Sequence, residues 1–536
     1  MKKIHLLILS VLSGVLFSIA WPQYGYPAFL FTAFIPLLII EDYIFRNREN
    51  FSRFSVFFYT YPAFLIWNVL TTWWVWNSTP VATLAWTLNA MFMGIVMNVY
   101  HLSRRNLYQQ NYGYFMLVFL WITFEYIHLN WGITWTWLNL GNGFAVHYTW
   151  IQWYEYTGTL GGTAWVLIIN IFLFKALNNL LLKQSTKRKI LIDAIVGVSL
   201  IIIPISFSNI IYYGYEEKED PINVIVTQPN LDPYGEQYSL PPADVIDINL
   251  NLAKSLIDGN PTIIAAPEST IQENIWEQNL DWSSTLKQIK AFIQENPEAK
   301  IIIGASTYIR LNEDEELPNS ARYHKSGKFY YDHFNTAFYL DSTENIQIHH
   351  KSKLTPGVEY MPSGGIFSFL EHFAIDLGGS VGSLGVSKNP GPFTVDENTK
   401  VAPIICYESI FGEYCTDFVK QGANLFIIIT NDGWWGNTPG HRQHLLFTSL
   451  RAIETRRCMG RSANTGISSF TNQRGDISQA TNYWERDVIK QELNLNEKIT
   501  FYAQFGDYFG RVSAFLSVIF ILLSVVFGIR RKKGLI

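Results

Sequence analysis

The sequence contains little cysteine and little charge. Its 536 residues include three cysteines, Cys406, Cys415 and Cys458, and a low, odd number is not typical of a disulfide framework. Charged residues make up 16%, whereas soluble domains usually carry about 25%. The deficit indicates membrane segments. No basic patch of the kind that binds nucleic acid is visible, so we expect no nucleic-acid partner.

The charge that is present is unevenly distributed. Residues 1–210 contain 12 Lys and Arg against 6 Asp and Glu, whereas residues 211–510 contain 23 against 38. Residues 511–536 contain 5 basic residues and no acidic ones. A basic, apolar N-terminal part and a basic tail therefore flank an acidic central part.

Long apolar stretches occupy the N-terminal part and recur before the tail. A transmembrane helix needs ~20 predominantly apolar residues. Eight stretches approach this length, at about 4–20, 24–41, 54–74, 81–103, 114–130, 161–182, 190–208 and 511–529. They predict a polytopic α-helical membrane domain, with transmembrane helices 1–7 in residues 1–210 and helix 8 at residues 511–529.

Basic residues gather in every second connection between these stretches. They are Arg46, Arg48, Arg53, Arg104, Arg105, Lys183, Lys187, Arg188 and Lys189, and the tail to residue 536 adds Arg530, Arg531, Lys532 and Lys533. Because cytoplasmic loops carry an excess of Lys and Arg, both termini are predicted to be cytoplasmic and the acidic part external. In a two-membrane bacterium this means a multi-pass protein of the inner membrane with a periplasmic domain.

Glu125 and His128 fall within the fifth apolar stretch. An ionisable residue inside a span is a candidate functional group. The alternative is that the helix ends early and that both side chains lie at the wet interface. The sequence leaves both interpretations open.

Residues 221–500 have the pattern of a layered α/β domain. Short apolar runs predict strands at Ile222–Thr227, Thr262–Ala266, Ile301–Thr307, Asn335–Leu340, Ile346–His350, Val401–Tyr407 and Asn424–Thr430. Helical patterns alternate with several of them, at about 243–258, 279–295, 409–420 and 440–457. Strands buried on both faces read as such continuous apolar runs.

Reactive or polar residues follow several of these strands directly. Glu268 follows one strand, Lys351 another and Cys406 a third, and the run from Asn431 to Trp434 follows a fourth. Sites in α/β sheets gather at the carboxyl ends of strands. We therefore expect these segments to meet at one site.

The residues that meet there have complementary chemistry. Cys406 is the candidate nucleophile, and its position before a helical pattern suggests a field that favours the thiolate. Glu268 is the candidate general base that takes the thiol proton. Lys351 is the candidate cation for a tetrahedral oxyanion, and Glu359 could orient it. Each alone is more often a core cysteine, a solvated acid or a surface lysine, so the hypothesis rests on the set.

His441 and His444 have a spacing that also suits a metal ion. No further His or Cys has convincing ligand spacing, and both residues lie in a helical pattern. We therefore expect no metal and no cofactor.

The same residues resemble the nitrilase (carbon–nitrogen hydrolase) superfamily. The matching segments are Ala266-Pro267-Glu268-Ser269, Lys351-x-x-Leu354-x-Pro356-x-x-Glu359-Tyr360-x-Pro362, Ile405-Cys406-Tyr407-Glu408, Asn431-Asp432-Gly433-Trp434-Trp435-Gly436 and Arg461-Ser462-Ala463-Asn464-Thr465-Gly466. The resemblance implies an αββα sandwich and a Glu268–Lys351–Cys406 triad. Eight spans flanking one such domain are similar to the membrane acyltransferases of this superfamily that modify lipoproteins.

This resemblance implies a two-step acyl transfer by a monomer at the lipid bilayer. Cys406 would take a fatty acyl chain from a phospholipid donor and pass it to the α-amine of a diacylglyceryl apolipoprotein acceptor. Glu359, Tyr407 and Glu408 would support the site, and Trp434 would line the lipid entrance. The entrance aromatic that follows the first domain strand has no clear counterpart, although Tyr234 or Tyr238 could serve.

Three points stay open in the sequence. A membrane-anchored carbon–nitrogen hydrolase (an amidase) would use the same triad, although an anchor needs only one span. A transporter or scaffold with a degenerate domain is disfavoured by the complete triad. Ile366–Phe373, with Phe367, Phe369, Leu370 and Phe373, could form an apolar lid or an ordinary core helix.

Overall fold

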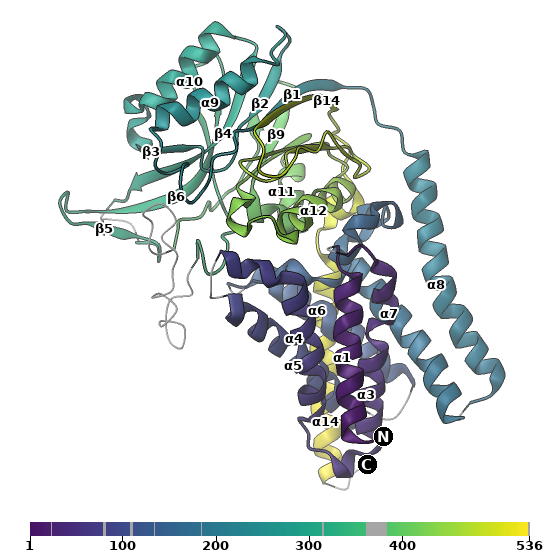
Figure 1. Ribbon diagram of the computed structural model, residues 1–536. Coiled ribbons are helices and arrows are strands. Elements are labelled where there is room, and N and C mark those ends of the chain that lie inside the picture. Colours follow the sequence, from purple (N-terminus) through teal and green to yellow (C-terminus); the bar gives the residue numbers. More distant parts are fainter. Residues whose placement is uncertain are drawn as a thin grey trace. The chain divides into compact units, whose positions relative to one another are not determined.

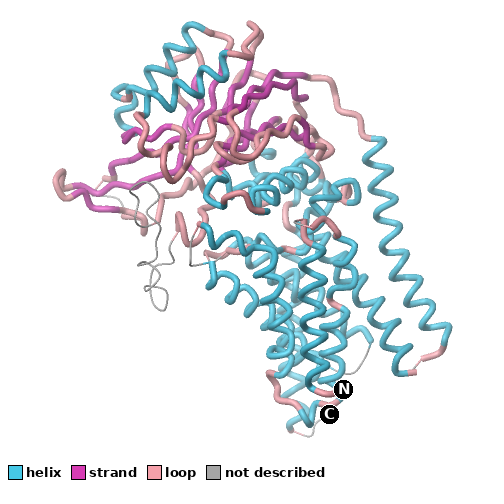
Figure 2. Tube along the Cα trace, viewed as in Figure 1, coloured by secondary structure: helices cyan, strands magenta, loops and turns pink. Residues whose placement is uncertain are grey.

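The computed structural model describes residues 1–22, 24–78, 82–107, 111–132, 134–183, 185–312, 316–360 and 383–533. Two compact units make up the chain. The helical unit comprises Met1–Trp73, Ala82–Tyr215 and Phe505–Ile536, and the sandwich unit comprises Trp74–Val81 and Glu216–Gln504. The strands in the described residues all belong to the sandwich unit (Figure 2). The hypothesised lid, Ile366–Phe373, lies outside the described residues.

The helical unit is a bundle (Figure 1). Its α-helices are α1 (Lys3–Ala20), α2 (Leu30–Ala33), α3 (Ile35–Arg46), α4 (Ser55–Thr72), α5 (Ala82–Leu107), α6 (Met116–Asn130), α7 (Tyr154–Leu182), α8 (Lys187–Gly214) and α14 (Tyr508–Lys532). Within the described residues, six segments are long and apolar enough to cross a membrane: Lys3–Ala20, Pro27–Arg46, Thr83–Leu107, Tyr154–Leu182, Lys187–Gly214 and Tyr508–Arg531. The expected membrane domain is therefore confirmed as a set of apolar helices.

The other two predicted spans correspond to α4 and α6, which do not meet that length and hydropathy. Helix α6 has 15 residues, and α4 contains Pro62 and the polar residues Asn68, Thr71 and Thr72. Both helices pack inside the same unit, α4 against α1 and α5, and α6 against α7 and α14. Because neighbouring helices cover them, these two need less apolar surface than a lipid-facing span does.

Arg104 differs from its expected role as a loop charge. It lies in the last turn of α5 and is buried. Its guanidinium binds Glu41 and Asp42 of α3, and the Asp42 contact measures 2.9 Å. A buried charge is tolerated when it is paired in this way. Arg104 therefore joins two helices and is weak evidence for orientation.

The sandwich unit contains two sheets. The first has the strand order β14-β1-β2-β4-β6-β5, with β3 pairing with β4 and β7 with β6. Its strands are β1 (Pro221–Gln228), β2 (Thr262–Ala265), β3 (Ile271–Trp276), β4 (Ala299–Arg310), β5 (Arg322–His324), β6 (Phe329–Leu340), β7 (Gln347–His350) and β14 (Asp487–Asn494). The β1–β2 and β2–β4 pairs are parallel, so β1, β2 and β4 end at the same edge.

The second sheet has the order β13-β12-β11-β10-β9-β8. Its strands are β8 (Phe393–Thr394), β9 (Lys400–Ile405), β10 (Leu425–Thr430), β11 (Met459–Ala463), β12 (Ser469–Thr471) and β13 (Ile477–Ser478). The central strands β9, β10 and β11 are parallel. The apolar runs of β9 and β10 are buried on both faces, as the sequence pattern predicts.

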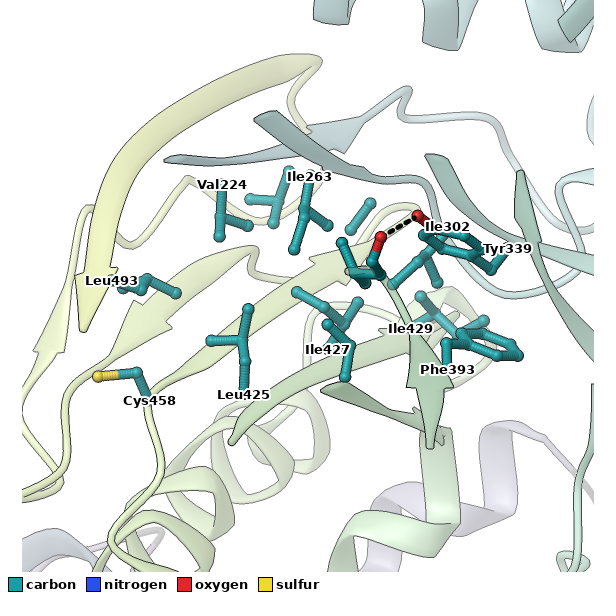
Figure 3. Packing of buried hydrophobic residues seen from close by; sticks show 14 of the residues in the cluster. Val224, Ile263, Ile302, Tyr339, Phe393, Leu425, Ile427, Ile429, Cys458 and Leu493 are labelled. Carbon is teal, nitrogen blue, oxygen red and sulfur yellow. Dashed lines mark hydrogen bonds between the residues drawn. The ribbon is translucent and has the colours of Figure 1, made fainter. Parts of the chain in front are cut away.

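An apolar core joins the two sheets face to face (Figure 3). Val224 and Ile263 reach it from the first sheet, and Leu425, Ile427 and Ile429 reach it from β10. Helices α9 (Pro242–Lys254) and α10 (Ser284–Glu295) cover the other face of the first sheet through a second apolar cluster. Helices α11 (Gly412–Lys420) and α12 (Pro439–Thr455) pack on the second sheet (Figure 1). The predicted αββα sandwich is confirmed.

Most predicted strands and helices of this unit are present with shifted ends. One shift affects the site, because β9 ends at Ile405 and the predicted strand ran to Tyr407. Cys406 instead begins the short 3-10 helix η9 (Cys406–Ile410). The nucleophile candidate therefore lies at a sharp turn between strand and helix.

Candidate active site

The four strand-end segments that the sequence singled out line one pocket. Its volume is about 180 Å³, and Glu268, Lys351, Cys406 and Trp434 all contribute to its wall. Glu268 follows β2 and Lys351 follows β7, so both come from the first sheet. Cys406 follows β9 and Trp434 follows β10 in the second sheet. The site is thus assembled from both sheets.

Lys351 lies between two carboxylates. Its Nζ is 3.0 Å from Glu268 Oε1 and 2.9 Å from Glu359 Oε1. Although burial disfavours its charge, Glu268 and Glu359 raise the pKa of Lys351 well above its usual value. Burial likewise opposes ionisation of Glu359, but the Lys351 ammonium holds the pKa of Glu359 below its usual value. The pocket therefore contains a fixed, fully charged ammonium.

Asn335 was not identified from the sequence as part of this cluster. Its Nδ2 donates to Glu268 Oε1 and to Glu359 Oε1, at 2.8 Å each. The backbone N–H of Asn431 donates to Glu268 Oε2 at 3.1 Å. These donors fix the Glu268 carboxylate while leaving it acceptor capacity toward the pocket. The sequence signal that could have identified Asn335 is the presence of an asparagine within the aromatic run of β6.

The turn that carries Glu268 packs closely against strand β4. Gly304 of β4 donates its N–H to the Pro267 carbonyl at 3.1 Å. A Cβ at residue 304 would lie 2.6 Å from backbone atoms of Pro267, Glu268 and Ser269. Ser269 has a φ of +55°, in the left-handed region that residues other than glycine rarely adopt. Glycine at 304 allows the turn to approach β4 this closely.

Cys406 has the same rare backbone conformation, with a φ of +51°. Such conformations cluster at functional sites, where the surrounding structure holds them. Burial raises the pKa of the Cys406 thiol, and the Glu268 carboxylate raises it further, while Lys351 lowers it. The expectation of a helix field that favours the thiolate was wrong, because η9 has only five residues. Burial and the Glu268 charge thus both raise the pKa of Cys406 and favour its thiol form.

Glu408 anchors this turn to the loop after β7. Its Oε2 accepts from the Ile405 N–H at 2.8 Å, and its Oε1 accepts from the Ser352 N–H at 2.6 Å. The Tyr414 hydroxyl also donates to Oε1, at 2.7 Å. Burial opposes the charge of Glu408, but His349 lowers its pKa below the usual value. Glu408 therefore fixes Cys406 relative to Lys351.

Aromatic side chains form another wall of the pocket. Trp434 contacts Tyr234 edge-on, with ring centroids 5.0 Å apart, and Tyr238 at 6.2 Å. All three residues line the pocket, so both candidate entrance tyrosines lie beside Trp434. The Ser78 hydroxyl donates to the Trp434 carbonyl at 3.2 Å. The buried Tyr407 ring packs edge-on against Phe411 at 5.3 Å.

A second polar group lies behind Cys406. Ligand atoms of Cys406, Asp432 and His444 lie within 4.8 Å of one another. Asp432 Oδ1 accepts from Thr430 Oγ1 at 2.8 Å and lies 3.0 Å from His444 Nδ1, and Arg461 binds Oδ2. Both carboxylate oxygens thus have protein partners, which favours a hydrogen-bond network over a metal site. That no metal is needed stays a prediction.

The suggested metal pair itself does not come together at this group. His441 stacks on Tyr483, with ring centroids 4.0 Å apart and an interplanar angle of 15°. His444, three residues later, forms the contacts to Asp432. The His441-x-x-His444 spacing therefore reflects two separate packing roles.

Glu125 and His128 are not at a wet interface. Helix α6 continues to Asn130, and both side chains are buried inside the helical unit. Glu125 accepts hydrogen bonds from Thr163 Oγ1 at 2.6 Å and from the Leu140 N–H at 2.9 Å. His128 Nε2 accepts from the Trp135 N–H at 3.0 Å. Both residues bind the irregular segment after α6, which gives them a structural explanation.

Similarity to known proteins agrees with this geometry. Residues 263–501 match the carbon–nitrogen hydrolase family, and residues 13–172 match the apolipoprotein N-acyltransferase N-terminal domain. An apolipoprotein N-acyltransferase of Chlorobaculum tepidum is 26% identical, over 97% of this chain and 96% of its own. One of Thermotoga maritima is 26% identical, over 99% of this chain and 95% of its own.

The fold and the pocket define a carbon–nitrogen hydrolase superfamily enzyme. Two findings distinguish one group within this superfamily: the N-terminal helices match the apolipoprotein N-acyltransferase N-terminal domain, and the alignments with the two relatives cover nearly the whole chain. The chain is similar to apolipoprotein N-acyltransferases over nearly its whole length, and its described residues include six helices that are long and apolar enough to cross a membrane.

Proposed function

We propose that this enzyme transfers a fatty acyl chain from a phospholipid to the α-amine of S-diacylglyceryl-cysteine on apolipoproteins, through a thioester on Cys406. Lipoprotein N-acylation is supported by the similarity to apolipoprotein N-acyltransferases over nearly the whole chain. The observation that carries the route is the meeting of Glu268, Lys351 and Cys406 in one pocket. The proposed route requires no metal and no cofactor.

The first half-reaction forms the thioester. Glu268 accepts the proton of the Cys406 thiol, and the sulfur attacks the carbonyl carbon of the phospholipid ester. The tetrahedral oxyanion is held by the Lys351 ammonium and the backbone N–H of Tyr407. When the C–O bond breaks, Glu268 returns the proton to the departing alkoxide, and lysophospholipid leaves.

The second half-reaction returns the enzyme to its starting state. The α-amine of the diacylglyceryl cysteine attacks the thioester carbon, and Glu268 accepts a proton from the amine nitrogen. The C–S bond then breaks, an amide remains on the apolipoprotein, and Cys406 recovers its proton. Lys351 keeps its charge in both steps, as expected for an ammonium whose pKa is raised by two carboxylates.

Six further residues support these steps. Glu359 and Asn335 hold Lys351 and Glu268 in register, and Glu408 fixes the turn at Cys406. Trp434, with Tyr234 and Tyr238, provides apolar surface for an acyl chain. The mixed polar and aromatic pocket suits a lipid ester better than a small polar amide.

The membrane helices give the reaction its setting. Both proposed substrates are anchored in the lipid bilayer, so a membrane-embedded enzyme meets them at a raised effective concentration. From the positive-inside pattern we infer a bacterial inner-membrane protein with its sandwich unit in the periplasm.

That orientation predicts which sites a membrane-impermeant maleimide reaches in intact spheroplasts. Lys218→Cys, in an exposed segment of the sandwich unit, is expected to react, whereas Lys187→Cys, at the exposed first residue of α8, is expected to react only after lysis. Both substitutions are made in the Cys406→Ala variant, because Cys406 lines the pocket, and the buried Cys415 and Cys458 then serve as an unreactive background. The reverse labelling pattern would contradict the orientation.

The reaction itself is tested with purified enzyme, a phospholipid labelled in its acyl chain and a diacylglyceryl-cysteine peptide. We expect N-acylated peptide and lysophospholipid in equal amounts. Without peptide, we expect a single turnover that ends at the Cys406 thioester. Steady release of free fatty acid with no acylated peptide would instead identify a hydrolase.

A further inference from the structure

We propose that His444 is a positioning residue that holds the Cys406 turn in its reactive conformation. This inference rests on the proposed function, because the reaction that it serves is thioester formation at Cys406. His444 belongs to α12, and its partners come from η9, from η10 (Asp432–Trp435) and from β11.

The Cys406 carbonyl is the point that His444 contacts. A left-handed residue between a strand and a 3-10 helix turns its carbonyl away from the regular hydrogen-bond pattern of both. Here that carbonyl accepts from the Ser409 hydroxyl at 2.8 Å and lies 3.2 Å from His444 Nε2. A carbonyl oxygen can only accept, so in this contact the hydrogen is the one on Nε2 of the imidazole tautomer that we propose. His444 Nε2 also lies 3.0 Å from the Ser409 hydroxyl oxygen.

The other ring nitrogen is fixed from behind. Asp432 Oδ1 lies 3.0 Å from Nδ1, and Arg461 binds Asp432 Oδ2 and lies 3.2 Å from Nδ1 through Nη2. Asp432, His444 and Arg461 are all almost completely buried. A carboxylate that fixes an imidazole ring determines where its far nitrogen points, as carboxylates do for metal-binding histidines. The chain Arg461–Asp432–His444 therefore ends on the Cys406 carbonyl.

This contact affects the position of two groups that the proposed reaction uses, the Cys406 Sγ and the Tyr407 N–H. The orientation of the Cys406 peptide sets the direction of its Sγ and that of the following Tyr407 N–H, which we propose as an oxyanion donor. A displacement of about 1 Å at a reacting group can lower a rate about 10²-fold. Glu268, held by Lys351, Asn335 and the Asn431 N–H, provides the base, so His444 is not required to move a proton.

Two amide substitutions, His444→Gln and His444→Asn, test the roles of the two ring nitrogens separately. Gln places a nitrogen close to the position of Nε2 and can still donate to the Cys406 carbonyl. Asn is shorter and reaches Asp432 without reaching that carbonyl. His441→Gln, on the same helix but stacked on Tyr483, is the matched control.

The measurement is single-turnover thioester formation from labelled phospholipid, with the rate followed against phospholipid concentration. We expect His444→Asn to lower the maximal rate about 10- to 100-fold at an unchanged half-saturating concentration. His444→Gln is expected to stay within about fivefold of the native rate, with an unaltered pH profile, because the base is unchanged. His441→Gln is expected to match the native rate, and thermal unfolding of each variant shows whether it folds.

Three results would overturn the proposal. The first is a native rate in a folded His444→Asn variant. The second is an equal loss of rate in both His444 variants together with an altered pH profile, which would make His444 a proton carrier. The third is a native enzyme that loses its activity to a chelator and regains it with Zn²⁺. Failure of the native enzyme to form any thioester would instead remove the proposed function itself.

Discussion

Cys406→Ala is expected to abolish acyl transfer, with a fall of about 10⁴-fold or more, because no thioester can form without the sulfur. The substitution removes one partly buried atom from the pocket wall and should leave the fold intact. Labelled phospholipid should leave no acid-stable, hydroxylamine-sensitive label on the variant protein.

The other two cysteines provide matched controls. Cys415 and Cys458 are buried, and burial raises the pKa of each thiol, that of Cys458 to about 12. Cys415→Ala and Cys458→Ala should transfer acyl groups at nearly the native rate, with only the modest loss of stability that a small core deletion causes. Native transfer by Cys406→Ala would refute the thioester route.

Glu268→Gln is expected to lower thioester formation by about 10²- to 10⁴-fold, the usual contribution of a general base. The variant also gives a second, opposite signal. Burial is the main cause of the raised pKa of Cys406, and the Glu268 charge adds to it. Removing that charge should lower the pKa of Cys406, so alkylation by iodoacetamide at a fixed neutral pH should become faster while acyl transfer is lost.

Lys351→Met is the matched opposite case. The Lys351 charge lowers the pKa of Cys406, so its removal should raise that pKa and slow alkylation. Transfer should also fall, because the oxyanion loses its cation. Glu344→Gln, an exposed carboxylate of the same unit, should change neither rate. Loss of both alkylation and transfer in Glu268→Gln would indicate a collapsed pocket and would remove the evidence for a base.

The sequence predicted the elements that have strong local signals. The runs before Glu268, Lys351 and Cys406 are strands, and parallel strand ends bring polar side chains to one place. Asn335 could not be chosen in the same way, because its role depends on which face of β6 points at Glu268. His444 depends likewise on how α12 lies against η9. Pairing across elements is not encoded in local periodicity.

Two further expectations failed for stated physical reasons. A thiol before a helical pattern was expected to be acidic, but burial and Glu268 outweigh a five-residue helix. Arg104 was counted as a loop charge, but carboxylates on α3 place it inside the bundle. Composition gives the charge of a residue and cannot give its partner.

The two-sheet origin of the pocket has a consequence for the apolar layer between the sheets. Glu268 and Lys351 follow strands of one sheet, and Cys406 follows a strand of the other. The distance between Cys406 and the other two residues therefore depends on how the two sheets pack. The side chains of Val224, Ile263, Ile427 and their neighbours fill the space between the sheets (Figure 3). In the proposed reaction this layer therefore helps to set the distance between Glu268 and Cys406. Apolar residues that never touch a substrate thus help to hold the geometry of the proposed site.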